Sequence, residues 1–226
     1  MKYKYQMHTH LTPCSKCAPM TPQELIDALI EGGFKGCVLT NHFIGGNTGI
    51  ERDLSWNEFV AEYEKNYLEC KKIANNHDLD IIFGIEEHVG NGVEVLCYGI
   101  TPQFLYDHPE LQLDRSIEAW SNALHDFGAL CIQAHPFRER AYISEPGLLP
   151  LQYIDGIEFF NACNKPEENE KASIAAQEHP EWILVAGADT HLPASACWAG
   201  ILTNTRITDE KTLVEILKSK DYELNL

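Results

Sequence analysis

The sequence predicts an α/β barrel that forms a single domain over residues 1–226, and three observations support this fold class. With 226 residues and 44% hydrophobic content, the chain can bury one sizeable core, and an α/β barrel can occupy this length as one domain. Short apolar segments typical of strands alternate with segments of helical periodicity. Histidines and carboxylates follow several strand-like segments, and the working residues of such barrels gather at the C-terminal ends of the strands.

The first strand is expected at residues 3–10, where the apolar residues alternate at the start. His8 and His10 then lie on the same side of the strand, because they are two positions apart. Imidazole nitrogens bind transition metals well, and a strand holds two such ligands in fixed positions. A His-X-His pair also occurs on ordinary solvent-facing strands, so it indicates a metal site only if later strands contribute ligands as well.

The helices are predicted from caps and apolar stripes. Thr21-Pro22-Gln23-Glu24 is a capping box with proline at the first helical position, and Gly32-Gly33 should end that helix. A long helix is expected from about Ser55 to Asn76, with Trp56 and Phe59 in its apolar stripe. Further helices are expected at residues 114–127, 166–178 and 209–218.

The later strands are short and apolar, as in a buried parallel sheet. They are expected at residues 36–40, 79–83, 93–100, 129–133, 156–161 and 182–186, with one more short strand at 199–203. Ligand-type side chains follow four of these strands, namely His42, Glu86, His135, Asp189 and His191. The other histidines, at positions 77, 88, 108, 125 and 179, are expected on the surface, with His88 a partial exception because it is close to Glu86.

The charge of the chain argues against two classes of partner. Seventeen basic and 34 acidic residues give a formal net charge of −17, which repels nucleic-acid backbones and anionic membranes. Neither a duplex nucleic acid nor a membrane is therefore an expected partner, although bound metal ions would still allow an anionic substrate. A cytoplasmic protein is expected, since no apolar leader and no run of roughly 20 apolar residues occurs. Nothing in the pattern specifies an oligomeric state.

The eight cysteines are scattered and imply no disulfide framework. Cys14 and Cys17 form a Cys-x-x-Cys pair, but no obvious second pair completes a structural zinc site. We expect these two residues to pack in a loop. They could instead lean over the main site, because they follow His10 closely.

At these positions the chain resembles the PHP family, the polymerase and histidinol phosphatase domain. Five motifs in the family's order carry the resemblance over nearly the whole chain: His8-Thr9-His10, Thr40-Asn41-His42, Gly84-Ile85-Glu86, Ala134-His135-Pro136 and Gly187-Ala188-Asp189-Thr190-His191.

The resemblance implies a distorted (β/α)7 TIM-like barrel that binds two or three divalent metal ions (Zn, Mn or Fe). It assigns the ligand roles to His8, His10, His42, Glu86, His135, Asp189 and His191, with Glu86 bridging ions. The implied activity is hydrolysis of a phosphoester by a metal-bound hydroxide, since metal ions neutralise phosphate oxygens and activate water. Our expected substrate is a small phosphomonoester: a metabolite, a histidinol-phosphate-like compound or a nucleotide.

The chain departs from the family pattern at three places. Asn41 replaces an aspartate that many members have before the second-strand histidine, which should tune the site rather than abolish it. Residues 14–17 offer Cys, Ser, Lys and Cys where many members have a histidine or aspartate. Glu94 stands in place of a fourth-strand histidine, and a carboxylate can still bind such an ion. The last two changes concern the ligands, and therefore the occupancy, of the third metal position.

Basic residues on the ligand-bearing loops are candidates for substrate binding. Arg138 is the preferred phosphate clamp, and we count it with Glu86 and His191 as catalytic. Arg140 and Lys165 are further candidates, although single basic residues are more often solvated surface charges. Glu158 either faces the mouth of the barrel with Asn161 or is a carboxylate of the barrel structure.

Three alternatives stay open: a metal-dependent nuclease, an amidohydrolase-like hydrolase, and a non-catalytic metal-binding or regulatory module. The nuclease is disfavoured by the acidic composition. An amidohydrolase-like site would be expected to carry a bridging lysine, and no lysine stands at a strand end. A non-catalytic module would bind metal without turnover.

Overall fold

The structure is a computed structural model that describes residues 2–226. One nine-stranded sheet forms its centre, in the order β7-β6-β5-β4-β3-β2-β1-β8-β9. The strands are β1 (Tyr3–Thr9), β2 (Gly36–Leu39), β3 (Asp80–Gly90), β4 (Val93–Tyr98), β5 (Leu130–Gln133), β6 (Gly156–Asn161), β7 (Ile183–Gly187), β8 (Gly200–Thr203) and β9 (Tyr222–Asn225). The helices are α1 (Pro22–Glu31), α2 (Trp56–Asn75), α3 (Pro102–Asp107), α4 (Ile117–Phe127), α5 (Pro166–Glu178) and α6 (Glu210–Ser219), with short 3-10 helices η1 (Pro109–Gln112), η2 (Leu151–Tyr153) and η3 (Pro193–Ser195).

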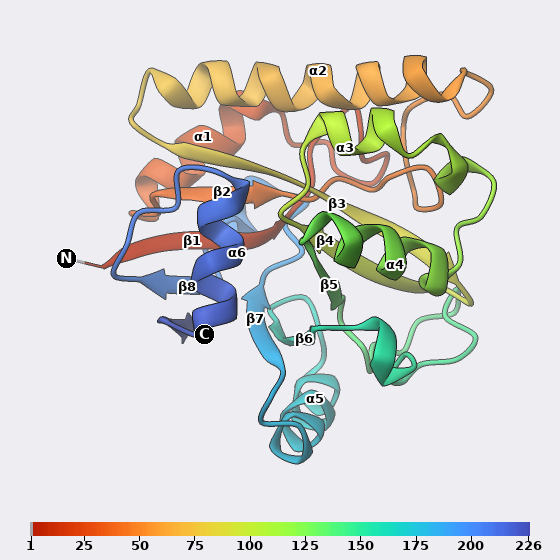
Figure 1. Ribbon diagram of the computed structural model, residues 1–226. Helices are drawn as coiled ribbons and strands as arrows, with labels where there is room; N and C mark the ends of the chain where they lie inside the picture. Colours follow the sequence, from red (N-terminus) through yellow and green to blue (C-terminus); the bar gives the residue numbers. More distant parts are fainter. Residues whose placement is uncertain (1) are drawn as a thin grey trace.

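The sheet closes on itself through the end of β1. There the Thr190 amide donates to the His8 carbonyl at 3.0 Å, and the His10 amide donates to the Thr190 carbonyl at 2.9 Å. The first half of β1 pairs instead with β8, so β7 and β8 share one edge of the same strand. The predicted α/β barrel is therefore confirmed, and its distortion is this split between β7 and β8 (Figure 1).

The sheet is mixed, so the expectation of an all-parallel sheet is wrong. β4 runs antiparallel to both β3 and β5, and β8 and β9 are also antiparallel to their neighbours. The reason lies in the turn Gly90-Asn91-Gly92, where Asn91 has φ 55° and Gly92 has φ 80°. Two successive residues with positive φ form the tight turn of a β-hairpin, which returns the chain directly as β4.

The same hairpin extends β3 to Gly90, beyond the predicted end at residue 83. Glu86 consequently lies within a strand and not at its end. α3 and β9 were also not predicted. α3 begins at Pro102, after the strand predicted at residues 93–100, and a strand follows α6 because residues 222–225 pair with β8.

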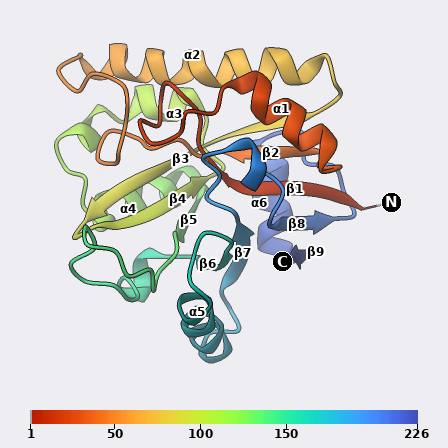
Figure 2. The ribbon, with the colours of Figure 1, turned by 180° about the vertical axis from the view of Figure 1, so that it is seen from behind.

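Apolar side chains fill the barrel and the space beneath the helices as two clusters. Tyr98, Met7 and Val185 belong to the interior cluster, which also contains Leu213 and Leu217 of α6. The second cluster lies between the sheet and the surrounding helices. Figure 2, seen from behind, places α1 and α2 together along one side of the molecule and α5 at the opposite side. Within residues 2–226, none of the helices has the length and apolarity that a membrane span requires.

Candidate metal centre

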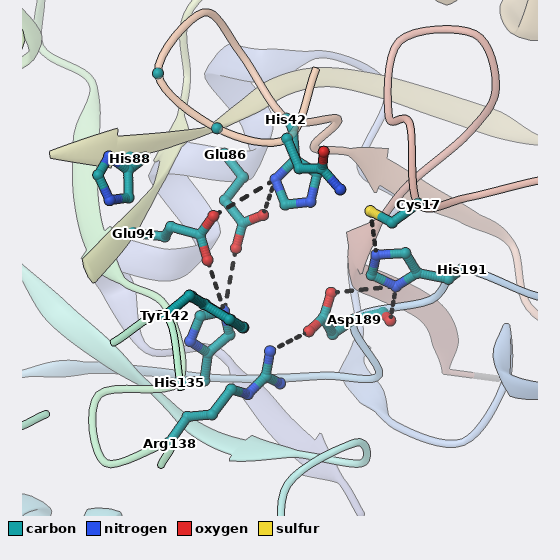
Figure 3. A pocket seen from close by; sticks show the side chains of 13 residues that line it. Cys17, His42, Glu86, His88, Glu94, His135, Arg138, Tyr142, Asp189 and His191 are labelled. Carbon is teal, nitrogen blue, oxygen red and sulfur yellow. Dashed lines mark hydrogen bonds and ion pairs between the residues drawn. The ribbon is translucent and has the colours of Figure 1, made fainter. Parts of the chain in front are cut away.

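The predicted ligands converge on one pocket at the carboxyl ends of the strands. All seven, His8, His10, His42, Glu86, His135, Asp189 and His191, lie in it or directly beneath it. Glu94 of β4 joins them. The pocket has a volume of about 470 Å³, the size of a small-molecule site (Figure 3).

Glu86 lies at the centre of the cluster because pairing of β2 with β3 continues beyond β2. The Glu86 amide donates to the Asn41 carbonyl and the Phe43 amide donates to the Glu86 carbonyl, which sets His42 beside Glu86. The Glu86 oxygens lie 2.8 to 3.4 Å from a ring nitrogen of four histidines, namely His8, His10, His42 and His135. A carboxylate with histidines around both oxygens is suited to bridge metal ions.

Asn41 supports this arrangement from below. Its Oδ1 accepts from the Leu11 amide at 2.5 Å and from the Ser15 hydroxyl at 3.0 Å. The Ser15 Oγ also lies 3.0 Å from His10 Nδ1 and accepts from the His42 amide. Asn41 therefore ties the loop after β1 to the end of β2.

Four sets of three residues have ligand atoms that all lie within 4.8 Å of one another. They are His8, His135 and Asp189; His8, His10 and Glu86; His42, Glu86 and Glu94; and His10, His42 and His191. The sets share members, so the cluster offers adjacent positions for more than one ion.

Unpaired buried nitrogens show that these residues fit a metal. His8 directs Nδ1 at Glu158 Oε1, 3.0 Å away, and His10 directs Nδ1 at the Ser15 hydroxyl. Nε2 of each ring makes no well-aligned hydrogen bond and instead faces a carboxylate of the cluster, at 3.1 Å from Glu86 for His8 and at 3.1 Å from Asp189 for His10. Both side chains are completely buried. A histidine that binds a metal typically uses its second nitrogen in this way, and an unpaired nitrogen at this depth would otherwise be costly.

Glu158, whose role the sequence left open, lies beneath the candidate metal centre. Besides His8, it accepts from the His135 amide at 3.0 Å and from Asn161 Nδ2 at 2.9 Å through Oε2. It is therefore a carboxylate of the barrel interior that orients two predicted ligands, and Asn161 fixes it. The contact between His8 and Glu158 joins residues 150 positions apart, so no local sequence pattern predicts it.

Two predicted ligands have strained backbones. His135 has φ 28° and Asp189 has φ 49°, a region that non-glycine residues seldom adopt. Each residue lies two positions after the end of a strand, β5 for His135 and β7 for Asp189, and each side chain turns into the cluster. Such strain persists where the surroundings hold it in place and concentrates at functional sites.

Burial and neighbouring charges shift the pKa values of the cluster in opposite directions. Burial opposes the charge on Glu86, but His8 and His42 outweigh this and hold its pKa well below the usual value. Burial, reinforced by the negative charge of Glu86, raises the pKa of Glu94 to about 8. Burial and the neighbouring His42 lower the pKa of His10 to about 3. A neutral His10 retains the lone pair that a metal requires, and a bound cation would favour ionised Glu94.

Arg138 reaches the pocket through a turn in which its amide donates to the His135 carbonyl. Its Nη1 donates to Asp189 Oδ2 at 2.5 Å and its Nε donates to Asn164 Oδ1 at 2.8 Å. Nη2 is buried without a partner, although the side chain lines the pocket. The guanidinium thus has a fixed orientation and a free donor beside the predicted ligands.

Arg140 and Lys165 are not brought to the pocket. Arg140 Nη1 donates to Glu168 Oε1 at 2.7 Å, and the half-buried guanidinium faces the start of α5. Lys165 is the exposed N-cap residue, directly before the same helix. Their contacts fit a structural role at the start of α5.

Besides the predicted residues and Glu94, the pocket is lined by Cys17, His88, Tyr142 and residues 45–47. Cys17 places Sγ 3.1 Å from His191 Nε2, while Cys14 is buried in the core, so only one of the pair leans over the site. His88 of β3 is also half-buried in the pocket wall, where its Nε2 accepts from the Gly92 amide. The hairpin of β3 and β4 carries it there, and its spacing from Glu86 was the available signal.

No protein-family model and no curated protein matches the sequence. Solved structures share its fold. A two-domain protein from Bacteroides vulgatus that contains a predicted PHP-like metal-dependent phosphoesterase is 15% identical, with a TM-score of 0.73 over 100% of this chain and 65% of that one. The lesion-specific endonuclease PfuEndoQ from Pyrococcus furiosus is 12% identical, with a TM-score of 0.64 over 99% and 58%.

An amidohydrolase from Chromobacterium violaceum, described with bound sulfate and no metal, is 16% identical. Its TM-score is 0.57 over 94% of the present chain and 96% of its own length. The chain spans less than two thirds of the Bacteroides and Pyrococcus proteins. At these identities the likeness shows a shared fold. The resemblance to PHP proteins is thereby confirmed at the level of the fold.

Proposed function

We propose that this chain is a metal-dependent phosphoesterase that hydrolyses a small phosphomonoester with two or three bound divalent ions. Those ions would be held by the seven predicted ligands together with Glu94. The observation that carries the proposal is a set of buried histidine nitrogens that make no well-aligned hydrogen bond and face the carboxylates of Glu86 and Asp189, beside a pocket that also holds Arg138.

Bound ions of this kind neutralise phosphate oxygens, activate water and stabilise the leaving oxygen. The chain's own residues would position the substrate. Arg138 would donate from Nη2 to a phosphate oxygen, because Asp189 and Asn164 already fix the rest of its guanidinium. Glu86 and Asp189 would hold the ions at a constant spacing. His191, whose Nδ1 lies 2.7 Å from the Asp189 carbonyl oxygen, would be the third catalytic residue beside Glu86 and Arg138.

The small size of the substrate is supported by the pocket and by the charge. A volume of about 470 Å³ suits a phosphorylated metabolite or a nucleotide. A net charge of −17 disfavours a polyanion such as the substrate implied by an endonuclease, since binding to nucleic acid relies on many contacts from basic residues. The sulfate recorded for the Chromobacterium amidohydrolase is a tetrahedral oxyanion, which agrees with phosphate binding in this fold.

A substrate panel tests the proposal. Zinc- or manganese-loaded protein should hydrolyse p-nitrophenyl phosphate and some of a set that includes histidinol phosphate and nucleoside monophosphates. Bis(p-nitrophenyl) phosphate and a damaged oligonucleotide represent the nuclease alternative, and p-nitroacetanilide represents the amidohydrolase-like alternative. Faster turnover of any of these three would replace the proposal with that activity.

A further inference from the structure

The loop after β1 places a thiol at one edge of the histidine cluster. Cys17 is exposed, and its Sγ lies 3.1 Å from Nε2 of His191. Figure 3 shows His42 between this thiol and the carboxylates of Glu86 and Glu94. No other cysteine lines the pocket among residues 2–226.

The histidines at this edge independently indicate a ligand. His10, His42 and His191 have ring nitrogens within 4.8 Å of one another. His10 and His42 are 0% and 7% exposed, and a nitrogen of each, Nε2 of His10 and Nδ1 of His42, makes no well-aligned hydrogen bond and faces a carboxylate of the cluster. Three imidazoles at such spacing, two of them deeply buried, form a donor set that suits a transition-metal cation.

The loop holds Cys17 in place from both sides. The Lys16 amide donates to the Asn47 carbonyl at 3.0 Å, and the Ala18 amide donates to the Ser15 carbonyl at 3.1 Å. Ser15 in turn contacts both His10 and His42. The position of the thiol is therefore coupled to that of the histidines, as in a preorganised site.

We propose that the Cys17 thiolate is a ligand of the metal position formed at this edge by His42 and His191, with His10 beside them. The inference rests on the proposed function and specifies its third metal position. In a tetrahedral zinc site, typical Zn–S and Zn–N bonds put the sulfur and nitrogen about 3.5 Å apart, close to the distance seen between Cys17 and His191.

A thiolate changes which ions this position prefers. Thiolates favour zinc, and carboxylates favour manganese and magnesium. The position at Cys17 should therefore retain zinc, or cobalt(II) in its place, in the presence of excess manganese. The positions around Glu86 and Glu94, which lack sulfur, should exchange their ions more readily.

Cobalt(II) spectroscopy tests the thiolate without relying on activity. Full-length metal-free protein is reconstituted with cobalt(II), and the absorption of thiolate-to-cobalt charge transfer is recorded in the near ultraviolet. Wild type and the control Cys163→Ser, which removes another exposed cysteine outside the pocket, should show the band. Cys17→Ser should lose it while keeping the visible cobalt absorption of the remaining ions. Cys17→Asp should lose the band but keep the ion count of wild type.

The outcomes separate the two proposals. A wild type that binds cobalt without the band, or a Cys17→Ser variant that keeps it, would overturn the thiolate ligand alone. The band in a protein that hydrolyses none of the panel would leave the ligand standing and remove the phosphoesterase. Binding of no ion by wild type would overturn both.

Discussion

Glu158 Oε1 lies 3.0 Å from Nδ1 of His8, and both side chains are completely buried beneath the predicted metal centre. The contact fixes the ring so that Nε2 points towards Glu86, 3.1 Å away. It is the carboxylate-histidine pairing that supports metal ligands in many proteins.

Replacing Glu158 with glutamine should weaken metal binding by about 10- to 100-fold, because the supporting carboxylate is lost while its shape is kept. Zinc affinity, measured by competition with a chromophoric chelator, checks this. Glu168→Gln is the matched control, since Glu168 is also a buried carboxylate but binds Arg140 outside the pocket. Equal zinc affinity in wild type and Glu158→Gln would refute the supporting role.

Changing Arg138 to alanine should raise KM for phosphate monoesters by roughly 10- to 100-fold, the effect expected from loss of a charge-assisted hydrogen bond. Arg138→Lys should recover only part of this, because an ammonium cannot keep the contacts to Asp189 and Asn164 together. Steady-state kinetics at saturating metal provides the measurement, with Arg140→Ala as control. Since Asp189 loses its partner as well, metal content is determined in parallel. An unchanged KM would discard the clamp.

Stability at alkaline pH should depend on Glu87, which is completely buried next to Glu86. Burial raises its pKa to about 8, although the Gly45 amide donates to it at 2.9 Å. A carboxyl whose pKa is raised by folding favours the protonated folded state. The resulting penalty is absent below the unfolded pKa of about 4.3 and grows by at most about 1.4 kcal/mol per unit as the pH rises to 8.

Glu87→Gln should therefore gain stability relative to wild type between pH 5 and pH 8.5, by up to a few kcal/mol. Urea unfolding in the presence of EDTA at the two pH values measures the difference. The exposed Glu170→Gln should show no such trend. A gain that is the same at both pH values would contradict the titration of Glu87.

Metal removal should destabilise the whole barrel, because the cluster joins β1, β3 and the ends of β5 and β7. An ion at 100 times its dissociation constant contributes about 2.7 kcal/mol to the folded state. Thermal unfolding with excess zinc and with EDTA should thus differ by several degrees per bound ion. A Tm that does not respond to zinc would be evidence against buried ion binding.

The barrel and the convergence of the predicted ligand residues on one pocket could be predicted from the sequence because both depend on local rules. Apolar segments ending in His42 or His135 indicate strands and place those side chains at the same end of the sheet. The hairpin of β3 and β4 was missed although Gly90-Asn91-Gly92 signals a tight turn, because the run of ligand-type residues was read as the end of a strand.

The supporting contacts could not be predicted in the same way. Glu158 contacts His8, which is 150 positions away in the sequence. Whether Glu158 faces the mouth of the barrel or its interior depends on which side of β6 faces inward. Cys14 and Cys17 lie in the same loop, which turns the Cys17 side chain towards the pocket and the Cys14 side chain into the core. Arg138 and Arg140 are two residues apart, yet a turn sends one to Asp189 and the other to Glu168.

The most direct test of the account is metal content together with turnover, in wild type and Glu86→Gln. Plasma mass spectrometry of untagged protein should find two or more ions per chain in wild type, and p-nitrophenyl phosphate should be hydrolysed only when zinc or manganese is present. Glu86→Gln should lose at least one ion and its turnover, because Glu86 contacts four of the histidines. Wild type without bound ions after reconstitution, or Glu86→Gln with full metal content and normal activity, would contradict the account.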